Sequence, residues 1–199
     1  MKVPLYRSRP VTDPRPMELV WPARPYLAGY VSALNRGWSR DETRPESGAE
    51  ERAAIKADPA LFLASLVDRE ARGAPITMPD GTQVPRLPGY KCWMWDGEFC
   101  GSIDLRWQPG TDALPIYCLG HIGYNVVPWK QRRGYATRAL GAMLTLAARE
   151  GLSRVEITTS PDNFASQKVI AAHGGLLAET FVTLPSQGSL TKYRYFIHL

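Results

Sequence analysis

Residues 126–140, VVPWKQRRGYATRAL, decide the fold of this chain. Two β-branched residues run into a proline, and an Ala-rich helical pattern begins after Gly134. This order predicts a strand, a short turn and the start of a helix. Lys130, Arg132 and Arg133 stand at the positive end of the helix macrodipole, where cations are unfavourable. A bound anion would account for their position.

The same turn has the features of an anion site. The backbone N–H groups of residues 132–137 include first-turn donors that have no partner within a helix. Gly134 and Ala136 let a ligand approach the backbone, and Thr137 adds a hydroxyl group. Such a site suits a phosphate or pyrophosphate, although an ordinary basic turn remains the alternative. The ATP and dinucleotide motifs GxxxxGK[ST] and GxGxxG are absent from the sequence.

Hydrophobic spacing and turn residues predict the other elements on both sides of this stretch. We expect strands over 17–21, 116–127, 154–159, 176–184 and 190–198, a hairpin over 90–107, and helices over 26–38, 59–72, 134–150 and 163–173. Asp96-Gly97 predicts a type I′ turn in the hairpin. Residues 39–58 and 74–89 read as loops. Gly120, Gly123 and Asn125 suggest a bulge in their strand, or another backbone or a ligand lying close to it. The element order predicts an α/β chain with much antiparallel pairing.

Length and composition limit the organisation and the class of protein. A chain of 199 residues suits one domain, over 17–199, preceded by an extended arm over 1–16. Neither a membrane span nor a signal peptide is evident, so we expect a cytoplasmic protein. The three cysteines lack CxxC spacing and read as reduced thiols, and no metal-ligand pattern is present. The net charge of +5 mildly favours anionic partners but does not indicate nucleic-acid binding.

Two spaced motifs resemble those of the GNAT superfamily of acetyl-CoA-dependent N-acetyltransferases. The run from Gln131 to Ala136, QRRGYA, resembles the signature Q/R-x-x-G-x-G/A. Asn163 and Ser166, followed by a helix and Gly174-Gly175, resemble the second signature of that superfamily. Together with the hairpin, these motifs cover roughly residues 90–198, and their wording is closest to a bacterial branch.

The resemblance implies a GNAT-like fold: a mixed, mostly antiparallel sheet flanked by helices, with a central parallel pair, 116–127 and 154–159, that splays apart. Acetyl-CoA would lie in the gap between these two strands. Its pantetheine would pair with the backbone of Tyr124, Asn125 and Val126. Its remaining contacts would come from Arg132, Arg133, Gly134, Tyr135, Ala136 and Thr137 at the pyrophosphate and from Asn163 and Ser166 beside the pantetheine or the adenosine phosphate.

The resemblance also implies transfer of the acetyl group to a primary amine by direct attack in a ternary complex. Such an attack needs a neutral amine, so a base is required. His121 has a suitable intrinsic pKa, and Glu156 is the carboxylate alternative, with Asp104 as a weaker option. Each also has a structural interpretation, as a hydrogen-bonded strand histidine or as a carboxylate in a surface ion pair.

The general acid departs from the family pattern. Ile170 stands where many members carry a tyrosine that protonates the departing thiolate. Tyr124 is a candidate substitute, as are Tyr193, Tyr195 and Ser166. A tyrosine packed in a strand or a serine that caps a helix is the alternative interpretation of each.

Two other classes of function stay open at this stage. A chain that keeps the cofactor loop but lacks the tyrosine would be a non-catalytic CoA-binding regulator, and a basic nucleic-acid-binding module is the less favoured option. No acceptor motif is evident, so the amine belongs either to a small molecule or to a peptide. The oligomeric state is equally open, with a homodimer as one option.

Overall fold

The computed structural model describes residues 16–40, 44 and 46–199. The arm expected over 1–16 therefore lies, except for its last residue, outside the described residues. The N-terminal half contains β1 Glu18–Val20, α1 Arg24–Asn35, α2 Ser47–Ala57, α3 Pro59–Ser65, β2 Val67–Asp68, β3 Ile76–Thr77, β4 Gln83–Val84, β5 Gly89–Trp95 and β6 Phe99–Arg106. None of the described helices is long and apolar enough to cross a membrane.

The C-terminal half supplies a second sheet and two helices. It contains β7 Ile122–Val126, the 3₁₀ turn Pro128–Lys130, α4 Tyr135–Arg149, β8 Arg154–Thr159, α5 Phe164–Ala171, β9 Leu176–Val182, the 3₁₀ turn Pro185–Gln187 and β10 Thr191–His198. One sheet has the order β1-β5-β6-β7, with β2 beside β5, the second has the order β8-β10-β9, and β3 and β4 form a small sheet of their own. Every strand pair among the described residues of these sheets is antiparallel.

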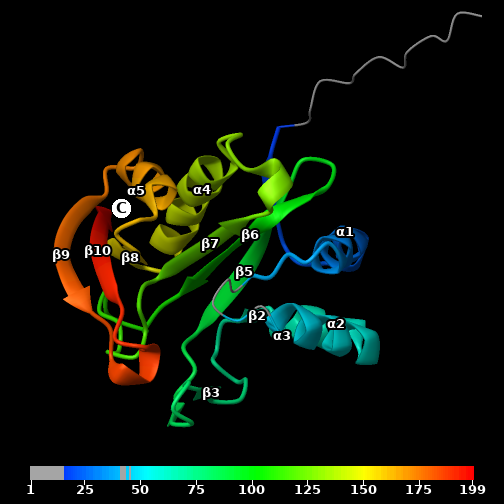
Figure 1. The fold of residues 1–199 in the computed structure, drawn as a ribbon, viewed down its shortest axis with the longest axis horizontal. Coiled ribbons are helices and arrows are strands. Elements are labelled where there is room, and N and C mark those ends of the chain that lie inside the picture. The colour runs from blue at the N-terminus through cyan, green and yellow to red at the C-terminus, as the bar shows by residue number, and fades with distance from the viewer. Residues whose placement is uncertain (1–15, 41–43, 45) are drawn as a thin grey trace, which may run out of the picture.

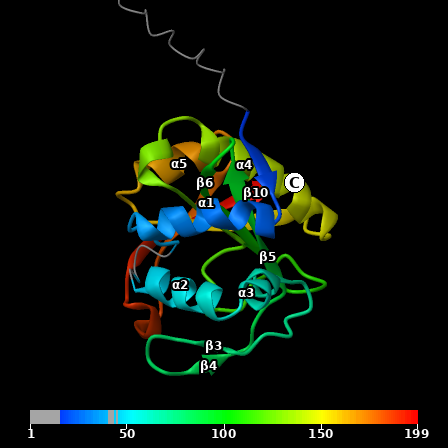
Figure 2. The same cartoon turned by 90° about the vertical axis from the view of Figure 1, so that its right-hand side faces the viewer.

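Helices cover the first sheet on both faces (Figure 1). The helices α1, α2 and α3 lie on one side, and α4 and α5 lie on the other, as the turned view also shows (Figure 2). Alternate residues of β5 enter separate cores, because successive side chains of a strand point to opposite faces. Cys92 and Met94 pack in the core under α4, whereas Trp93 packs with Tyr30 of α1. Burial on both faces thus fixes β5–β7 as the rigid centre of the fold.

The hairpin forms where the sequence predicts it, but its turn is longer than a two-residue type I′ turn. Trp95 pairs with Phe99, which leaves a three-residue loop over 96–98, and the register shifts between Met94 and Trp95. Gly97 has a φ of 108°, in the region that favours glycine. The longer loop turns the Asp96 carboxylate toward Lys130.

Four segments differ from the sequence prediction, and one of them is the expected loop over 74–89, which contains the short strands β3 and β4. The expected loop over 39–58 contains α2, whose polar sequence buries Ile55 as its one large apolar residue. The helix predicted over 59–72 ends at Ser65, after which β2 begins. The long strand expected over 116–127 begins only at Ile122. The preceding segment leaves the sheet, because the Tyr117 hydroxyl donates to Pro85 O and the Gln187 side chain donates to Tyr117 O.

The bulge predicted at Gly123 and Asn125 is also wrong, because the register between β6 and β7 runs without a shift. Gly123 has a different purpose. A Cβ atom there would lie 3.1 Å from an Arg106 guanidinium nitrogen and 3.2 Å from the Asp104 carboxylate. The missing side chain therefore leaves room for this ion pair across β7.

The two sheets meet where β7 and β8 approach each other. There the His121 N–H donates to Glu156 O at 2.7 Å, and Gly120 is so close that a Cβ atom would lie 3.1 Å from that oxygen. Beyond this contact, no ladder joins β7 to β8 among the described residues. The central parallel pair implied by the resemblance stays a prediction. Its predicted splaying would leave the edge of β7 without a neighbouring strand, and that edge is open beyond His121.

Ile170 tests which side of α5 faces the core. Its side chain is 0% exposed and packs in the core under α4, against Gly175. Ile170→Ala should lower the free energy of unfolding by about 2–5 kcal/mol, because it leaves a cavity. Phe164→Ala in the same helix is the matched control, because Phe164 is 67% exposed, and should change stability by about 0.5 kcal/mol or less. Urea unfolding of both variants measures this, and equal losses would contradict the packing.

Candidate active site

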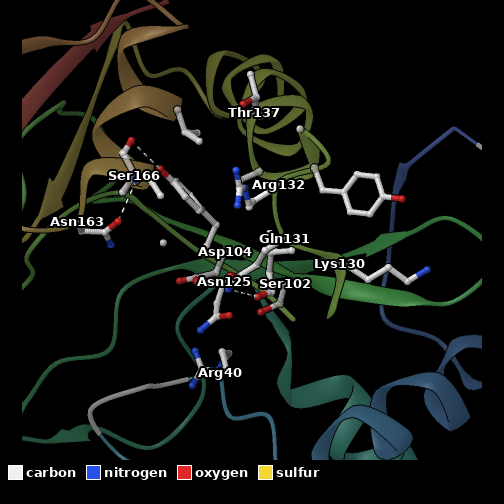
Figure 3. Close-up of a pocket in the computed structure, with 18 of the residues that line it drawn as sticks. Arg40, Ser102, Asp104, Asn125, Lys130, Gln131, Arg132, Thr137, Asn163 and Ser166 are labelled. Atoms are coloured by element: carbon white, nitrogen blue, oxygen red, sulfur yellow. Dashed lines mark hydrogen bonds between the residues drawn. The ribbon is translucent and has the colours of Figure 1, made fainter. Parts of the chain in front are cut away.

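A cavity of about 880 Å³ opens along β7 between the two sheets. It is walled by the start of α4, the start of α5, β7 and the face of β6 that carries Ser102, Asp104 and Arg106, and one arginine reaches it from the loop after α1 (Figure 3). Its lining consists of Arg40, Ser102, Asp104, Arg106, Gly123, Tyr124, Asn125, Val126, Lys130, Gln131, Arg132, Gly134, Tyr135, Ala136, Thr137, Asn163, Ala165, Ser166 and Val169.

The turn before α4 has an uncommon backbone. Arg132 has a φ of 62° and Gly134 a φ of 73°, so two left-handed residues flank Arg133. A left-handed conformation costs a non-glycine residue about 1–2 kcal/mol. Such strain clusters at ligand-binding sites, and the first-turn N–H groups of α4 face the cavity as unpaired donors. The turn thus suits a phosphate or pyrophosphate.

A buried carboxylate from the hairpin holds this turn in place. Asp96 receives the Lys130 ammonium at 2.9 and 3.0 Å and the Tyr135 hydroxyl at 2.6 Å. These hydrogen bonds outweigh the effect of burial and keep the pKa of Asp96 below its ordinary value. Lys130 is consequently occupied and points away from the cavity centre in Figure 3. Lys130 is paired with Asp96 and Arg133 lies outside the cavity lining, whereas Arg132 extends into the cavity and has no ion-pair partner among the described residues.

A pair of hydroxyl groups lies on the opposite wall. The Tyr124 hydroxyl and the Ser166 hydroxyl are 2.8 Å apart (Figure 3). Burial raises the pKa of Tyr124 to about 12, so its hydroxyl keeps its proton at neutral pH. Asn163 accepts the Ser166 N–H at 2.9 Å and thereby caps α5. The cap sets where Ser166 stands relative to Tyr124.

The edge of β7 offers backbone groups to the cavity. The Val127 N–H donates to Cys100 O, and Arg106 N–H donates to His121 O. Because antiparallel strands alternate, these bonds direct the odd-numbered residues of β7 toward β6. The backbone groups of Tyr124 and Val126 then face the open edge. Asn125 faces the cavity with its side chain, which accepts the Trp38 indole N–H at 3.0 Å.

His121 is not brought to the cavity. Its side chain is 0% exposed, its Nδ1 accepts the Glu156 N–H at 2.9 Å, and burial lowers its pKa to about 4. The one lone pair that could take a proton is therefore engaged. Its predicted role as the base stays a prediction that this geometry does not favour.

Two other predicted residues also lie outside the cavity lining. Glu156 forms an ion pair with Arg194 at 2.7 Å, on the face of β8 opposite the buried Val155 and Ile157. Arg133 is exposed, and its carbonyl accepts a hydrogen bond from Arg138. The other predicted cofactor residues line one cavity, although they come from three separate segments: Tyr124, Asn125, Val126, Arg132, Gly134, Tyr135, Ala136, Thr137, Asn163 and Ser166.

Sequence reasoning missed Arg40, Ser102 and Arg106 and ranked Asp104 low. Ser102 and Asp104 pair with Asn125 and Gly123 of β7, so they follow from the strand register once Asn125 is placed. The alternation of side chains between the two faces of the hairpin was the sequence signal that could have placed Ser102 and Asp104. No local signal marks Arg40, because tertiary packing brings the loop after α1 to β7.

The residues fit acetyl-CoA in three respects. The turn offers first-turn donors and Arg132 to a pyrophosphate, the β7 edge offers Tyr124 and Val126 to an amide-bearing chain, and a hydroxyl pair lies between. The acetyltransferase (GNAT) domain family matches residues 52–175. The match covers more than half of the chain, so the chain belongs to this family of acetyltransferases. Its acyl donor is acetyl-CoA.

Solved structures share the fold at low identity. The microcin C7 self-immunity acetyltransferase MccE, in complex with acetyl-CoA and AMP, is 14% identical, with a TM-score of 0.61 and coverage of 95% of this chain and 94% of that chain. The ribosomal L7/L12 α-N-protein acetyltransferase RimL, in complex with coenzyme A, is 17% identical, with a TM-score of 0.61 and coverage of 96% and 97%.

An acetyltransferase from Salmonella typhimurium that modifies the N-terminal serine of ribosomal protein L7/L12 is 18% identical. Its TM-score is 0.59, and the similarity covers 96% of this chain and 98% of that one. Among curated proteins, none matches this sequence. These likenesses show the fold.

Gly134 allows a direct test of the anion turn. Gly134→Val should weaken CoA binding by about tenfold or more, because a β-branched residue resists the left-handed conformation that the turn requires. Gly151→Val, after the other end of α4, is the matched control, because Gly151 also has a positive φ, of 90°. Both variants lose stability, but only Gly134→Val should lose affinity in calorimetry. Equal affinities would remove the turn from the site.

His121 allows a second test. Its folded pKa of about 4 lies below the ordinary 6.5, so the unfolded chain binds a proton between these values and the folded chain does not. The contribution of neutral His121 to the free energy of unfolding is therefore lost as the pH falls from about 6.5 to 4. His121→Gln keeps an acceptor for the Glu156 N–H and should flatten this dependence in urea unfolding. The pH profile of turnover from 6 to 9 should stay unchanged, and a lost limb would instead identify His121 as the base.

Proposed function

We propose that the protein transfers the acetyl group of acetyl-CoA to a primary amine by direct attack of the amine in a ternary complex. The cavity carries this proposal, because one continuous space joins the anion turn, the hydroxyl pair and a charged end at β6. Bound acetyl-CoA supplies an activated thioester. The turn at 132–137 and the β7 edge would hold the cofactor, and the end near Asp104 would hold the amine.

The Tyr124–Ser166 pair supports a role in proton donation. Departure of the CoA sulfur requires a proton or a stabilising donor. The Tyr124 hydroxyl keeps its proton at neutral pH and lies 2.8 Å from Ser166, so either hydroxyl can donate to the sulfur and be resupplied by the other. Ile170, at the position of the family's tyrosine, is buried in the core and lies outside the cavity lining, so we assign the proton donor to the Tyr124–Ser166 pair instead.

The buried thiols support direct attack over an acyl-enzyme. A thiolate is the nucleophile in cysteine chemistry. Burial raises the pKa of Cys92 and of Cys100 to about 12, so both stay protonated at neutral pH. Neither residue lines the cavity.

The amine end of the cavity contains a carboxylate that suits an ammonium group. Asp104 lines the cavity opposite Gly123 and is paired with Arg106. We assign Asp104 to attract the incoming amine, with proton loss to water, since a bound amine needs only a modest base. His121 and Glu156 remain the alternative bases, and the pH profile of His121→Gln described above tests the first of them.

Turnover of acetyl-CoA with a library of primary amines, followed by thiol release, tests the proposal. Tyr124→Phe with Ser166→Ala should lower kcat by about 10²-fold or more, since both proton donors are lost. CoA affinity should change much less. Tyr193→Phe on β10 is the control and should retain full activity, because Tyr193 lies outside the cavity lining. Tight CoA binding without turnover on any amine would favour a non-catalytic regulator.

A further inference from the structure

Charged side chains line the acceptor end of the cavity, and their arrangement limits which acceptors can bind there. It lies across β7 from the hydroxyl pair and is lined by Arg40, Ser102, Asp104 and Arg106. In Figure 3, Arg40 lies below Asn125, on the opposite side of it from the α4 turn and Thr137. The cofactor turn and this end are therefore separate parts of one space, and the groups at this end face the acceptor.

Asp104 and Arg106 neutralise each other. They project from the same face of β6 and form an ion pair seated over Gly123, whose missing side chain makes room for it. The Asp104 carboxylate raises the pKa of Arg106 further, so the guanidinium stays charged. The pair presents one anionic and one cationic group to the cavity and no net charge.

Arg40 differs, because its guanidinium is under-satisfied. Its nearest described partner is Glu51, with Nε and Oε1 3.6 Å apart, which is too long for a hydrogen bond. The other oxygen of Glu51 accepts the Tyr30 hydroxyl at 2.5 Å. Arg40 Nε is buried without a hydrogen-bond partner, although the side chain as a whole is 32% exposed and lines the cavity. The exposed part of the guanidinium lines the cavity and forms no hydrogen bond with a described residue, so it can donate to an anionic ligand there.

The surrounding charge also disfavours a polycation. Lys91 of β5 lies opposite Asp104 in the register of the β5–β6 ladder. Burial first, and then the charge of Arg40, lower its pKa to about 8. Three basic groups, Arg40, Lys91 and Arg106, therefore stand against two carboxylates, Asp104 and Glu51. A polyamine would add like charges to this end, whereas a carboxylate would relieve them.

We propose that the acceptor is a small amine that also carries a carboxylate, an α-amino acid in the simplest case, with its carboxylate on Arg40 and its amine beside Asp104. The planar guanidinium matches a carboxylate with two parallel hydrogen bonds. The inference rests on the proposed function and names the class of acceptor for that same cavity.

Matched acceptors test this directly. The twenty L-amino acids, their primary amides and the corresponding decarboxylated amines are assayed for thiol release from acetyl-CoA. The free acids should exceed their amides and amines in kcat/KM by about 10- to 100-fold, because only they pair with Arg40. Amides that equal their acids would overturn the inference, as would a preference for polyamines or for a serine-initiated peptide.

Two variants test whether Arg40 causes the preference for free acids. Arg40→Gln should raise KM for the best free acid by about 10- to 100-fold, reduce the difference between acid and amide, and leave CoA affinity unchanged. Arg36→Gln is the matched control, since Arg36 lies over the Trp129 ring, outside the cavity lining, and should change none of these. An unchanged KM in Arg40→Gln would contradict the inference.

Binding measurements distinguish a failure of the proposed catalysis from a failure of the proposed acceptor class. If CoA binds but no amine is acetylated, the proposed function fails. Saturation-transfer NMR of the same amino acids and amides with the CoA-loaded protein then decides the acceptor question. Acids that bind, and that lose binding in Arg40→Gln, uphold the carboxylate site, whereas equal binding of acids and amides overturns it.

Discussion

The Asp96 carboxylate is the interaction on which the site depends. It lies in the hairpin between β5 and β6, and it receives both Lys130 and Tyr135 from the turn before α4. Removing one partner of a buried charge pair costs about 3–5 kcal/mol, because the other charge is left unpaired. The pair therefore fastens the anion turn to the rigid centre of the sheet. The strained φ of Arg132 can persist because this attachment holds both sides of the turn.

The rest of the cavity follows from the strands beside this attachment. Burial on both faces sets the register of β5 and β6, and that register places Ser102 and Asp104 against β7. The edge of β7 stays open because it joins β8 through the contact at His121 and Glu156 and then diverges. His121 is thus a structural link between the sheets, and its full burial suits that purpose.

Local patterns in the sequence predicted the elements that carry strong periodicity. The α4 helix, the hairpin and the order of the last strands were predicted because their apolar spacing is regular, and the motifs around Gly134 and Asn163 indicated a common cavity. The α2 helix was missed because its polar sequence buries few apolar residues. The segment before Ile122 was read as a strand because it is apolar, but contacts of Tyr117 draw it away from the sheet. Lys130 was counted with the two arginines as a cation of the turn, although tertiary packing pairs it with Asp96, and Arg40 had no local signal at all.

Site-resolved binding tests the central claim most directly, that the cavity along β7 holds acetyl-CoA with its pyrophosphate on the turn before α4. Amide resonances are followed by NMR while CoA is titrated into the protein. The account predicts the largest shifts at residues 132–137 and at Tyr124 and Val126. Small shifts are expected around a second cavity, of about 310 Å³, which lies between α1 and the hairpin and is lined in part by Arg36 and Trp129. Saturable binding that shifts the second cavity and leaves residues 132–137 unchanged would contradict it.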